Sequence, residues 1–290
     1  TSVRAPRFPD GSTMSQTGAF VADDWSVGER LDVLGGVRWS TSRTRLPASS
    51  EFAATTVEDD GFTGNLGVAR ALTDSVRLVA NLGQGFRAPN VFDLGTFGDR
   101  PGNRFNVPNP ALEPEQVTTL DAGWKVLNDR LEGEFIGYYS RYRDKITSVL
   151  TGEVTDSGRL VVQSQNAARL VLYGAEFALR HQLSDSVEWR TQLTWTHGEE
   201  TFAGDDHPAD RIPPLNGSAG ITGRPATRWT LDGWLNFADQ QDRYSPRDEV
   251  DPRIRPDSTP GWATFNVRAA WEPSEHVYTS LQYGNIGDHR

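Results

Sequence analysis

Apolar and polar residues alternate along most of this chain. In residues 31–39, Leu31, Val33 and Trp39 share one face and Asp32 lies on the other. Successive side chains of a β-strand point to opposite faces, so this alternation predicts strands with one apolar face. The same pattern recurs in residues 76–87, 118–126, 173–183, 229–237 and 263–271.

The connections between these segments alternate between short and long. Short polar turns are expected at 27–29, 73–74, 128–130, 184–185, 225–227 and 273–275. Long stretches rich in charge, Pro and Gly occupy 44–58, 88–114, 150–159, 203–213 and 241–260. In an antiparallel meander this places every short turn at one end of the sheet, as in outer-membrane barrels with short periplasmic turns and long extracellular loops. A soluble sandwich has no reason to sort its loops in this way.

The expected strands are also long. We count about twelve, most of about 10–14 residues, whereas strands of globular proteins have about five or six. This length is enough for a tilted membrane crossing. The pattern therefore predicts an all-β fold, an antiparallel up-and-down transmembrane β-barrel, and leaves open a soluble, aromatic-rich β-protein that binds glycans.

Composition agrees with a barrel. The 290 residues are 36% hydrophobic and 10% aromatic, with nine Trp. Mean hydropathy is −0.55, which suits a barrel whose lipid face takes only every second residue of a strand. The chain contains no Cys, so disulfides and thiol chemistry are excluded, and its net charge of −10 argues against nucleic acid as a partner.

The direction of the strands leads to an expectation about completeness. If the short turns are periplasmic, the first strand runs inward, the last runs outward, and both termini lie at the long-loop end. Complete bacterial barrels have an even number of strands and close beside their own first strand. We therefore expect an internal piece of a larger barrel, with strands missing before Thr1 and at least one missing after Arg290.

Two motifs, followed by others in a fixed order, resemble those of the TonB-dependent outer-membrane receptors. GFRAP (85–89) carries Phe86, Arg87, Ala88 and Pro89, and NPALEPE (109–115) carries Asn109, Pro110, Leu112, Pro114 and Glu115. Further segments resembling this family are 138–146, 165–180, 211–217, 241–254, 259–271 and 283–290.

The resemblance implies a 22-stranded barrel in the bacterial outer membrane, of which residues 1–290 supply about twelve strands. It further implies a nutrient receptor and transporter rather than an enzyme. Its partners would be outer-membrane lipid, a scarce nutrient such as an iron chelate or haem, and the TonB complex. The N-terminal plug that contacts TonB, the early strands and the final strand are expected to lie outside these residues.

The resemblance also indicates where a nutrient would bind. Candidate ligand-binding residues are Arg87, Asn90, Phe92, Asp93, Phe97, Arg243 and Arg247. Haem-uptake members commonly carry a haem-ligating histidine between the two motifs, yet residues 90–108 contain none. Residues 12–21 and 211–217 resemble the haem and haemoglobin branch of the family, but the missing histidine counts against haem. A ferric siderophore is therefore preferred over haem, with sugars, cobalamin and other ligands left open, and no cofactor is expected.

Other chemistry is less well supported. Residues 83–88 fit the dinucleotide fingerprint G-x-G-x-x-A, but they lie in an alternating strand and Pro89 follows, so no phosphate-binding helix is expected. Asp205, Asp206, His207 and Asp210 could hold a hard cation, although a solvated acidic loop is the favoured interpretation. No nucleophile, metalloprotease or P-loop motif is present, so we predict neither a metal site nor catalysis.

Overall fold

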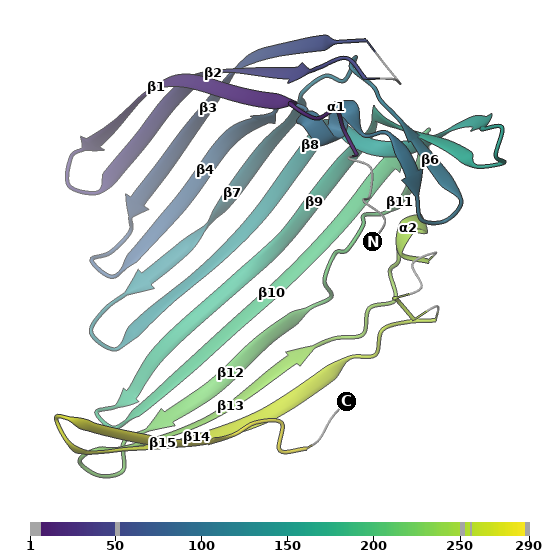
Figure 1. Cartoon of the computed structure of the whole chain (residues 1–290). Coiled ribbons are helices and arrows are strands. Elements are labelled where there is room, and N and C mark those ends of the chain that lie inside the picture. Colours follow the sequence, from purple (N-terminus) through teal and green to yellow (C-terminus); the bar gives the residue numbers. More distant parts are fainter. Residues whose placement is uncertain (1–6, 50–52, 250–252, 256, 288–290) are drawn as a thin grey trace.

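The chain forms one strongly curved sheet (Figure 1). The structure is a computed structural model that describes residues 7–49, 53–249, 253–255 and 257–287, without the side chain of Arg247. Within these residues the sheet has fifteen strands, and twelve of them follow one another in the order β1-β2-β3-β4-β7-β8-β9-β10-β12-β13-β14-β15. Every neighbouring pair along this path is antiparallel, which confirms the predicted up-and-down arrangement. The sheet is not closed, because β1 and β15 do not pair with each other.

The twelve strands of this path have the following bounds. They are β1 (Thr13–Val27), β2 (Leu31–Leu46), β3 (Thr55–Ala71), β4 (Val76–Arg87), β7 (Glu115–Leu127), β8 (Leu131–Val154), β9 (Leu160–Ser184), β10 (Val187–Phe202), β12 (Asn216–Gly223), β13 (Trp229–Ala238), β14 (Trp262–Ser274) and β15 (Val277–Tyr283). The long connections contain β5 (Gly98–Arg100), β6 (Arg104–Val107), β11 (Asp205–Pro208) and the helices α1 (Val91–Gly95) and α2 (Pro246–Glu249). Among the described residues, no helix is long and apolar enough to cross a membrane.

All six predicted short turns are confirmed, but several strands are longer than expected. The strands β8 and β9 have 24 and 25 residues and remain paired as far as Val154 and Leu160. Similarly, β2 and β3 pair up to Leu46 and Thr55. The predicted loops 150–159 and 44–58 were therefore too long. Backbone pairing continues past the apolar alternation because its hydrogen bonds do not depend on which side chains face lipid.

The register separates an apolar face from a polar one. Cross-strand pairs such as Trp39–Phe62 and Leu82–Leu120 lie on the first face, and Phe62 is 72% exposed there. We call this the outer face and the polar, concave side the inner wall. A face with this many exposed aromatic and aliphatic side chains is what contact with lipid requires.

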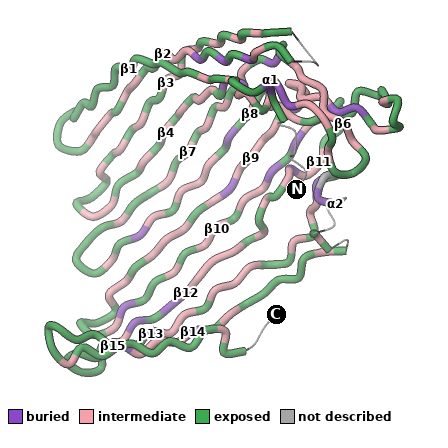
Figure 2. Tube along the Cα trace, viewed as in Figure 1, coloured by how far each residue is buried: buried purple, intermediate pink, exposed green. Residues whose placement is uncertain are grey.

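The buried core is small and lies at the long-loop end of the sheet (Figure 2). Leu46, Leu94 and Leu112 form it, with Val57, Val91 and Ile146 packed against it. The five-residue helix α1 is too short to be stable alone, because a single helical turn does not repay its nucleation. Leu94 holds it against β2.

This packing predicts the effect of Leu94→Ala. Leu94 is 0% exposed, so the substitution should cost about 2–5 kcal/mol of local stability and free the loop of residues 88–114 from the sheet. Limited proteolysis in detergent should then cut within this loop. Phe92→Ala, in the same helix but 48% exposed, is the matched control and should leave the loop resistant. Equal resistance of both variants would contradict the assignment.

A second prediction concerns Gly174 on the inner wall. A Cβ there would lie 2.2 Å from the Trp195 carbonyl oxygen and 2.6 Å from the Tyr138 hydroxyl, which bonds Thr196 at 2.6 Å. Gly174→Ala should therefore separate strands or displace the Tyr138 ring, and lower the unfolding temperature seen by heat-modifiable gel migration. Gly67→Ala, whose Cβ would meet nothing closer than 3.7 Å, should leave that temperature unchanged. Identical unfolding curves for the two variants would show that the neighbouring strand and Tyr138 leave room for a Cβ at Gly174.

Candidate functional site

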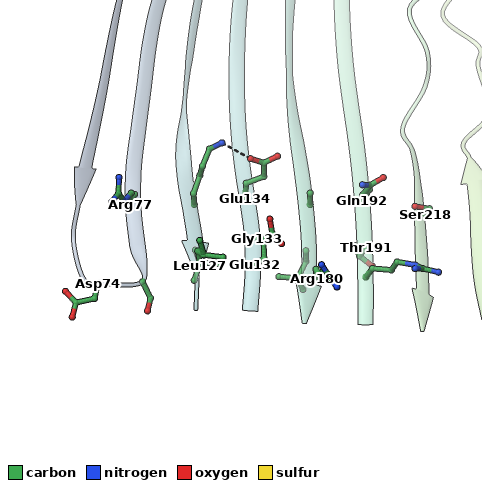
Figure 3. A pocket seen from close by; sticks show the side chains of 16 residues that line it. Asp74, Arg77, Leu127, Glu132, Gly133, Glu134, Arg180, Thr191, Gln192 and Ser218 are labelled. Carbon is green, nitrogen blue, oxygen red and sulfur yellow. Dashed lines mark ion pairs between the residues drawn. The ribbon is translucent and has the colours of Figure 1, made fainter. Parts of the chain in front are cut away.

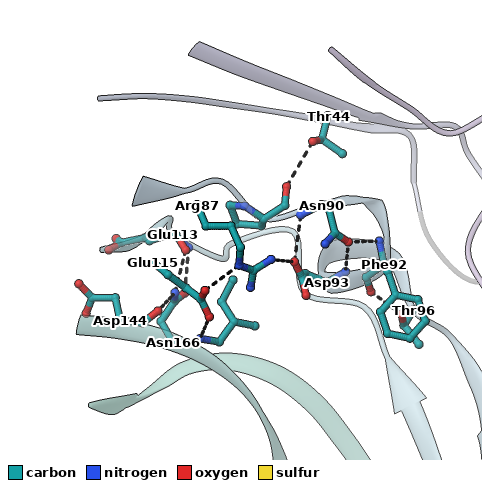
Figure 4. Close-up of polar contacts among 12 residues, drawn as sticks. Thr44, Arg87, Asn90, Phe92, Asp93, Thr96, Glu113, Glu115, Asp144 and Asn166 are labelled. Atoms are coloured by element: carbon teal, nitrogen blue, oxygen red, sulfur yellow. Dashed lines mark hydrogen bonds and ion pairs between the residues drawn. The ribbon is translucent and has the colours of Figure 1, made fainter. Parts of the chain in front are cut away.

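The first candidate site is the loop between β4 and β7, which lies at the long-loop end of the sheet (Figure 1). Figure 4 shows its polar contacts. Arg87, at the end of β4, pairs across the ladder with Glu115. Its Nε donates to Glu115 Oε2 at 2.6 Å and its Nη1 to Asp93 Oδ2 at 2.6 Å. The arginine of the first motif and the glutamate of the second are thus joined directly.

The next residues of the loop are used to start α1. Asn90 Oδ1 accepts hydrogen bonds from the backbone N–H groups of Phe92 at 2.8 Å and Asp93 at 3.1 Å. Asp93 Oδ2 accepts in return from Asn90 N at 3.0 Å, which completes a capping box. The Thr44 hydroxyl donates to the Pro89 carbonyl at 3.3 Å. Asn90 and Asp93 therefore order the loop.

The second motif attaches the end of the loop to β8 and β9. Asn109 N donates to the Leu94 carbonyl at 2.9 Å, and its Nδ2 donates to the Ser164 carbonyl at 2.8 Å. Glu115 Oε1 accepts from Ile146 N at 2.7 Å. Leu112 is buried, as are Ala88 and Pro89 of the first motif, while Phe86, Pro110 and Pro114 are partly or fully exposed.

Asn166 connects this region to a third family segment, and the sequence reasoning did not single it out. Its Oδ1 accepts from Glu113 N at 2.8 Å, and its Nδ2 donates to the carbonyls of Glu113 and Asp144, each at 2.7 Å. The sequence signal that could have identified Asn166 is its place in segment 165–180, which resembles a motif of the family. A single asparagine side chain thus joins the connection before β7 to β8 and β9.

Two aromatic candidates lie on the other side of the same loop. Phe92 borders a hollow of about 200 Å³ together with Thr96, Arg100 and Asn106. Phe97 packs edge-on against Phe105, with ring centroids 5.0 Å apart. Arg100 Nη1 donates to the Ser148 hydroxyl at 3.1 Å. Arg7 and Asp99 line the hollow as well, so a small molecule there would meet one aromatic ring, two guanidiniums and a carboxylate.

The remaining candidates lie at a different place in the sheet. Arg243, between β13 and β14, contacts His197 Nδ1 at 2.8 Å and Glu199 Oε1 at 3.8 Å, both on β10. Arg247 belongs to α2, but its side chain lies outside the described residues. The predicted ligand residues thus divide between the β4–β7 region and the connection between β13 and β14, from which Arg243 reaches β10.

The inner wall carries a second candidate site that the sequence reasoning missed. At the short-turn end, charged residues of adjacent strands line a hollow of about 850 Å³ (Figure 3). Lys125 Nζ lies 3.0 Å from Glu134 Oε2, and Arg180 Nη2 lies 2.9 Å from Glu188 Oε2. Each of these residues occupies a polar position in a strand of alternating apolar and polar residues. Only the register of the strands shows which of them form ion pairs.

The most buried carboxylate of this wall belongs to Asp232. Its side chain is 1% exposed, and it accepts from Thr222 Oγ1 at 2.6 Å and from Arg268 Nε at 2.8 Å. Arg190 Nη2 lies 3.5 Å away. Two guanidiniums and a hydroxyl compensate one buried charge, as burial of a carboxylate requires. The cluster connects β10, β12, β13 and β14.

The alternative chemistries of the sequence can be placed as well. Gly83 and Gly85 pair with Thr119 and Val117 inside the β4–β7 ladder, so the fingerprint residues form a strand and no phosphate loop. Asp206 accepts from Thr201 Oγ1 at 2.6 Å. Within the described part of the chain, no three His, Asp or Glu side chains gather as metal ligands.

Comparison with solved structures shows the same fold. The copper transporter OprC superimposes with a TM-score of 0.78 at 22% identity, covering 96% of this chain and 43% of OprC. The hemophore receptor HasR of Serratia marcescens gives a TM-score of 0.73 at 16% identity, covering 94% of this chain and 48% of HasR. At these identities the likeness concerns the fold alone.

A sequence relative points in the same direction. The ferric enterobactin receptor of Pseudomonas aeruginosa is 24% identical over 154 residues, which is 47% of this chain and 20% of that receptor. The chain spans less than half the length of OprC and HasR, and the matched part of the enterobactin receptor is a fifth of its length.

The family is established by a model that covers nearly the whole sequence. The TonB dependent receptor-like, beta-barrel family matches residues 1–286. Its members are receptors and transporters of the bacterial outer membrane rather than enzymes, and the soluble glycan-binding alternative does not fit. The chain belongs to the TonB-dependent receptor β-barrel family of the bacterial outer membrane.

Proposed function

We propose that this chain forms part of the barrel of a receptor that takes up a scarce nutrient, with energy supplied through TonB. The observation that carries the proposal is the division of the sheet into an apolar outer face and a charged inner wall. A polar nutrient needs a polar passage, and an apolar exterior is needed to hold that passage in a membrane. The chain covers 43% of OprC, which supports a plug, further strands and a TonB contact supplied outside these residues.

For the nutrient we favour a ferric siderophore over haem. Residues 90–108 hold no histidine, and His197 is engaged by Arg243 and stacks on Tyr173, with ring centroids 4.7 Å apart. A ferric chelate with anionic or aromatic groups would find Phe92 and Arg100 at the loop hollow. The relative named as a ferric enterobactin receptor supports this preference, whereas HasR was solved with haem and OprC is a copper transporter.

The nutrient can be tested by fluorescence titration of the detergent-purified protein with ferric enterobactin, a ferric trihydroxamate and haemin. We expect saturable binding of a ferric siderophore, weakened about tenfold by Phe92→Ala because a partly buried ring contributes about 1.5 kcal/mol. Phe62→Ala, on the outer face, is the control and should bind normally. Tight haemin binding with a Soret shift, and no siderophore binding, would refute the preference while leaving the transport proposal intact.

We further propose that Arg87 positions the loop instead of contacting the nutrient, since two carboxylates already occupy its guanidinium. Arg87→Gln and Glu115→Gln should each make the loop of residues 88–114 protease-sensitive. The double variant should be little worse than either single one, because both remove the same ion pair. Arg87→Lys should restore part of the resistance. A variant that loses nutrient affinity while its loop stays fully resistant would instead make Arg87 a ligand contact.

A further inference from the structure

Three arginines of β8 and β9 form no ion pair with any carboxylate in the described part of the chain. Arg141, Arg143 and Arg169, here called the arginine cluster, are all exposed. None of them forms an ion pair or a side-chain hydrogen bond with another described residue, whereas Arg43, exposed on the same face, pairs with Glu58 at 3.0 Å. Exposed arginines without a partner are available to an external anion.

The register places the cluster on the outer face. Tyr139 lies opposite Leu120 and Tyr173, which belong to the apolar face, and Arg141 is two residues further along β8 on the same side. Arg143 lies opposite Gln116, again two residues further. Arg169 lies opposite Thr201, four pairs beyond Tyr173 in the β9–β10 ladder and therefore on the same face as Tyr173. All three therefore point away from the inner wall.

The cluster lies just beyond a band of aromatic side chains, on the side of the long loops. Tyr139 is 47% exposed and Trp195 is 44% exposed. Tyr173 packs edge-on against Trp195, with ring centroids 5.9 Å apart. Tyr and Trp on the outer face of a barrel mark the boundary between hydrocarbon and headgroups. The arginines that follow thus lie at the level of the headgroups of the outer leaflet.

The backbone brings these like charges together. Tyr142 pairs with Leu170 and Lys145 with Ala168, so the bulge residues Arg143 and Asp144 lie opposite Arg169. Neighbouring strands are only about 5 Å apart, and like charges facing each other across strands are destabilising unless an anion is shared.

No carboxylate of the described residues, Glu113 beside the bulge included, forms an ion pair with the arginine cluster. Glu199 is held by His197 at 3.3 Å and by Arg243 at 3.8 Å, and Asp206 accepts from Thr201 at 2.6 Å. Asp144 is the one acidic residue within the bulge itself. The three arginines therefore outnumber the one carboxylate that the bulge supplies.

We propose that the arginine cluster binds the phosphate groups of an outer-leaflet glycolipid. Guanidinium groups bind phosphate through paired N–H donors, and arginines at a membrane surface recognise anionic headgroups. The aromatic band would pack against the sugar and the upper acyl chains of the same lipid. The proposal rests on membership of an outer-membrane family and is independent of the nutrient.

Native mass spectrometry of the intact receptor in a non-ionic detergent tests this, with diphosphoryl lipid A as the probe. Arg141→Gln/Arg143→Gln/Arg169→Gln should bind at least about tenfold more weakly than the unaltered protein. Arg43→Gln is the matched control and should bind normally. Lipid A stripped of its phosphates should bind the unaltered protein no better than the triple variant binds the intact lipid.

Three results would overturn the proposal: equal binding by the triple variant, equal binding of phosphate-free lipid A, or displacement of the lipid by equimolar inorganic pyrophosphate, which would indicate a site for soluble anions. Heat-modifiable migration checks that the triple variant is folded. If it is not, the single variants Arg141→Gln and Arg169→Gln provide the test, and each should weaken lipid A binding by a smaller factor.

Discussion

The structure depends on the continuous antiparallel pairing of backbone groups from β1 to β15. In hydrocarbon no water can satisfy an N–H or C=O group, so each strand must bond to its neighbours along its membrane-embedded length. That pairing fixes the register, and the register decides which side chains face lipid and which face the inner wall. The apolar pair Trp39–Phe62 and the ion pair Lys125–Glu134 are both consequences of it. A slip by one residue would exchange the two faces.

The two family motifs together attach the β4–β7 loop to the sheet. Arg87 holds Glu115 and Asp93, while Asn90 caps α1 and Leu94 fills the small core. Each contact is modest, but they share atoms and partners, so the loop is ordered as one unit. A binding surface that includes Phe92 can be presented on this ordered loop with little loss of conformational entropy on binding.

The sequence predicted the fold because alternation and loop length are local signals. It also predicted that the motifs around Arg87 and Glu115 matter, although not that these two side chains pair. Strand lengths were underestimated where β8 and β9 continue beyond the apolar stretch, since pairing there depends on the partner strand. The short elements α1, β5 and β6 are held by Leu94 and by contact with β9, which no local pattern reveals. The roles of Asn166 and Asp232 likewise required the register, because their partners lie 53 and 36 residues away in sequence.

The hairpin β5–β6 is joined to the sheet by a parallel ladder of four residue pairs, from Arg104–Leu160 to Val107–Gln163. By contrast, β9 is joined to β8 by nineteen pairs. A pulling force on the hairpin would therefore shear β6 away from β9 long before it disturbed the strands beneath. Under load, the β5–β6 hairpin would detach first, and the paired strands of the sheet would stay intact.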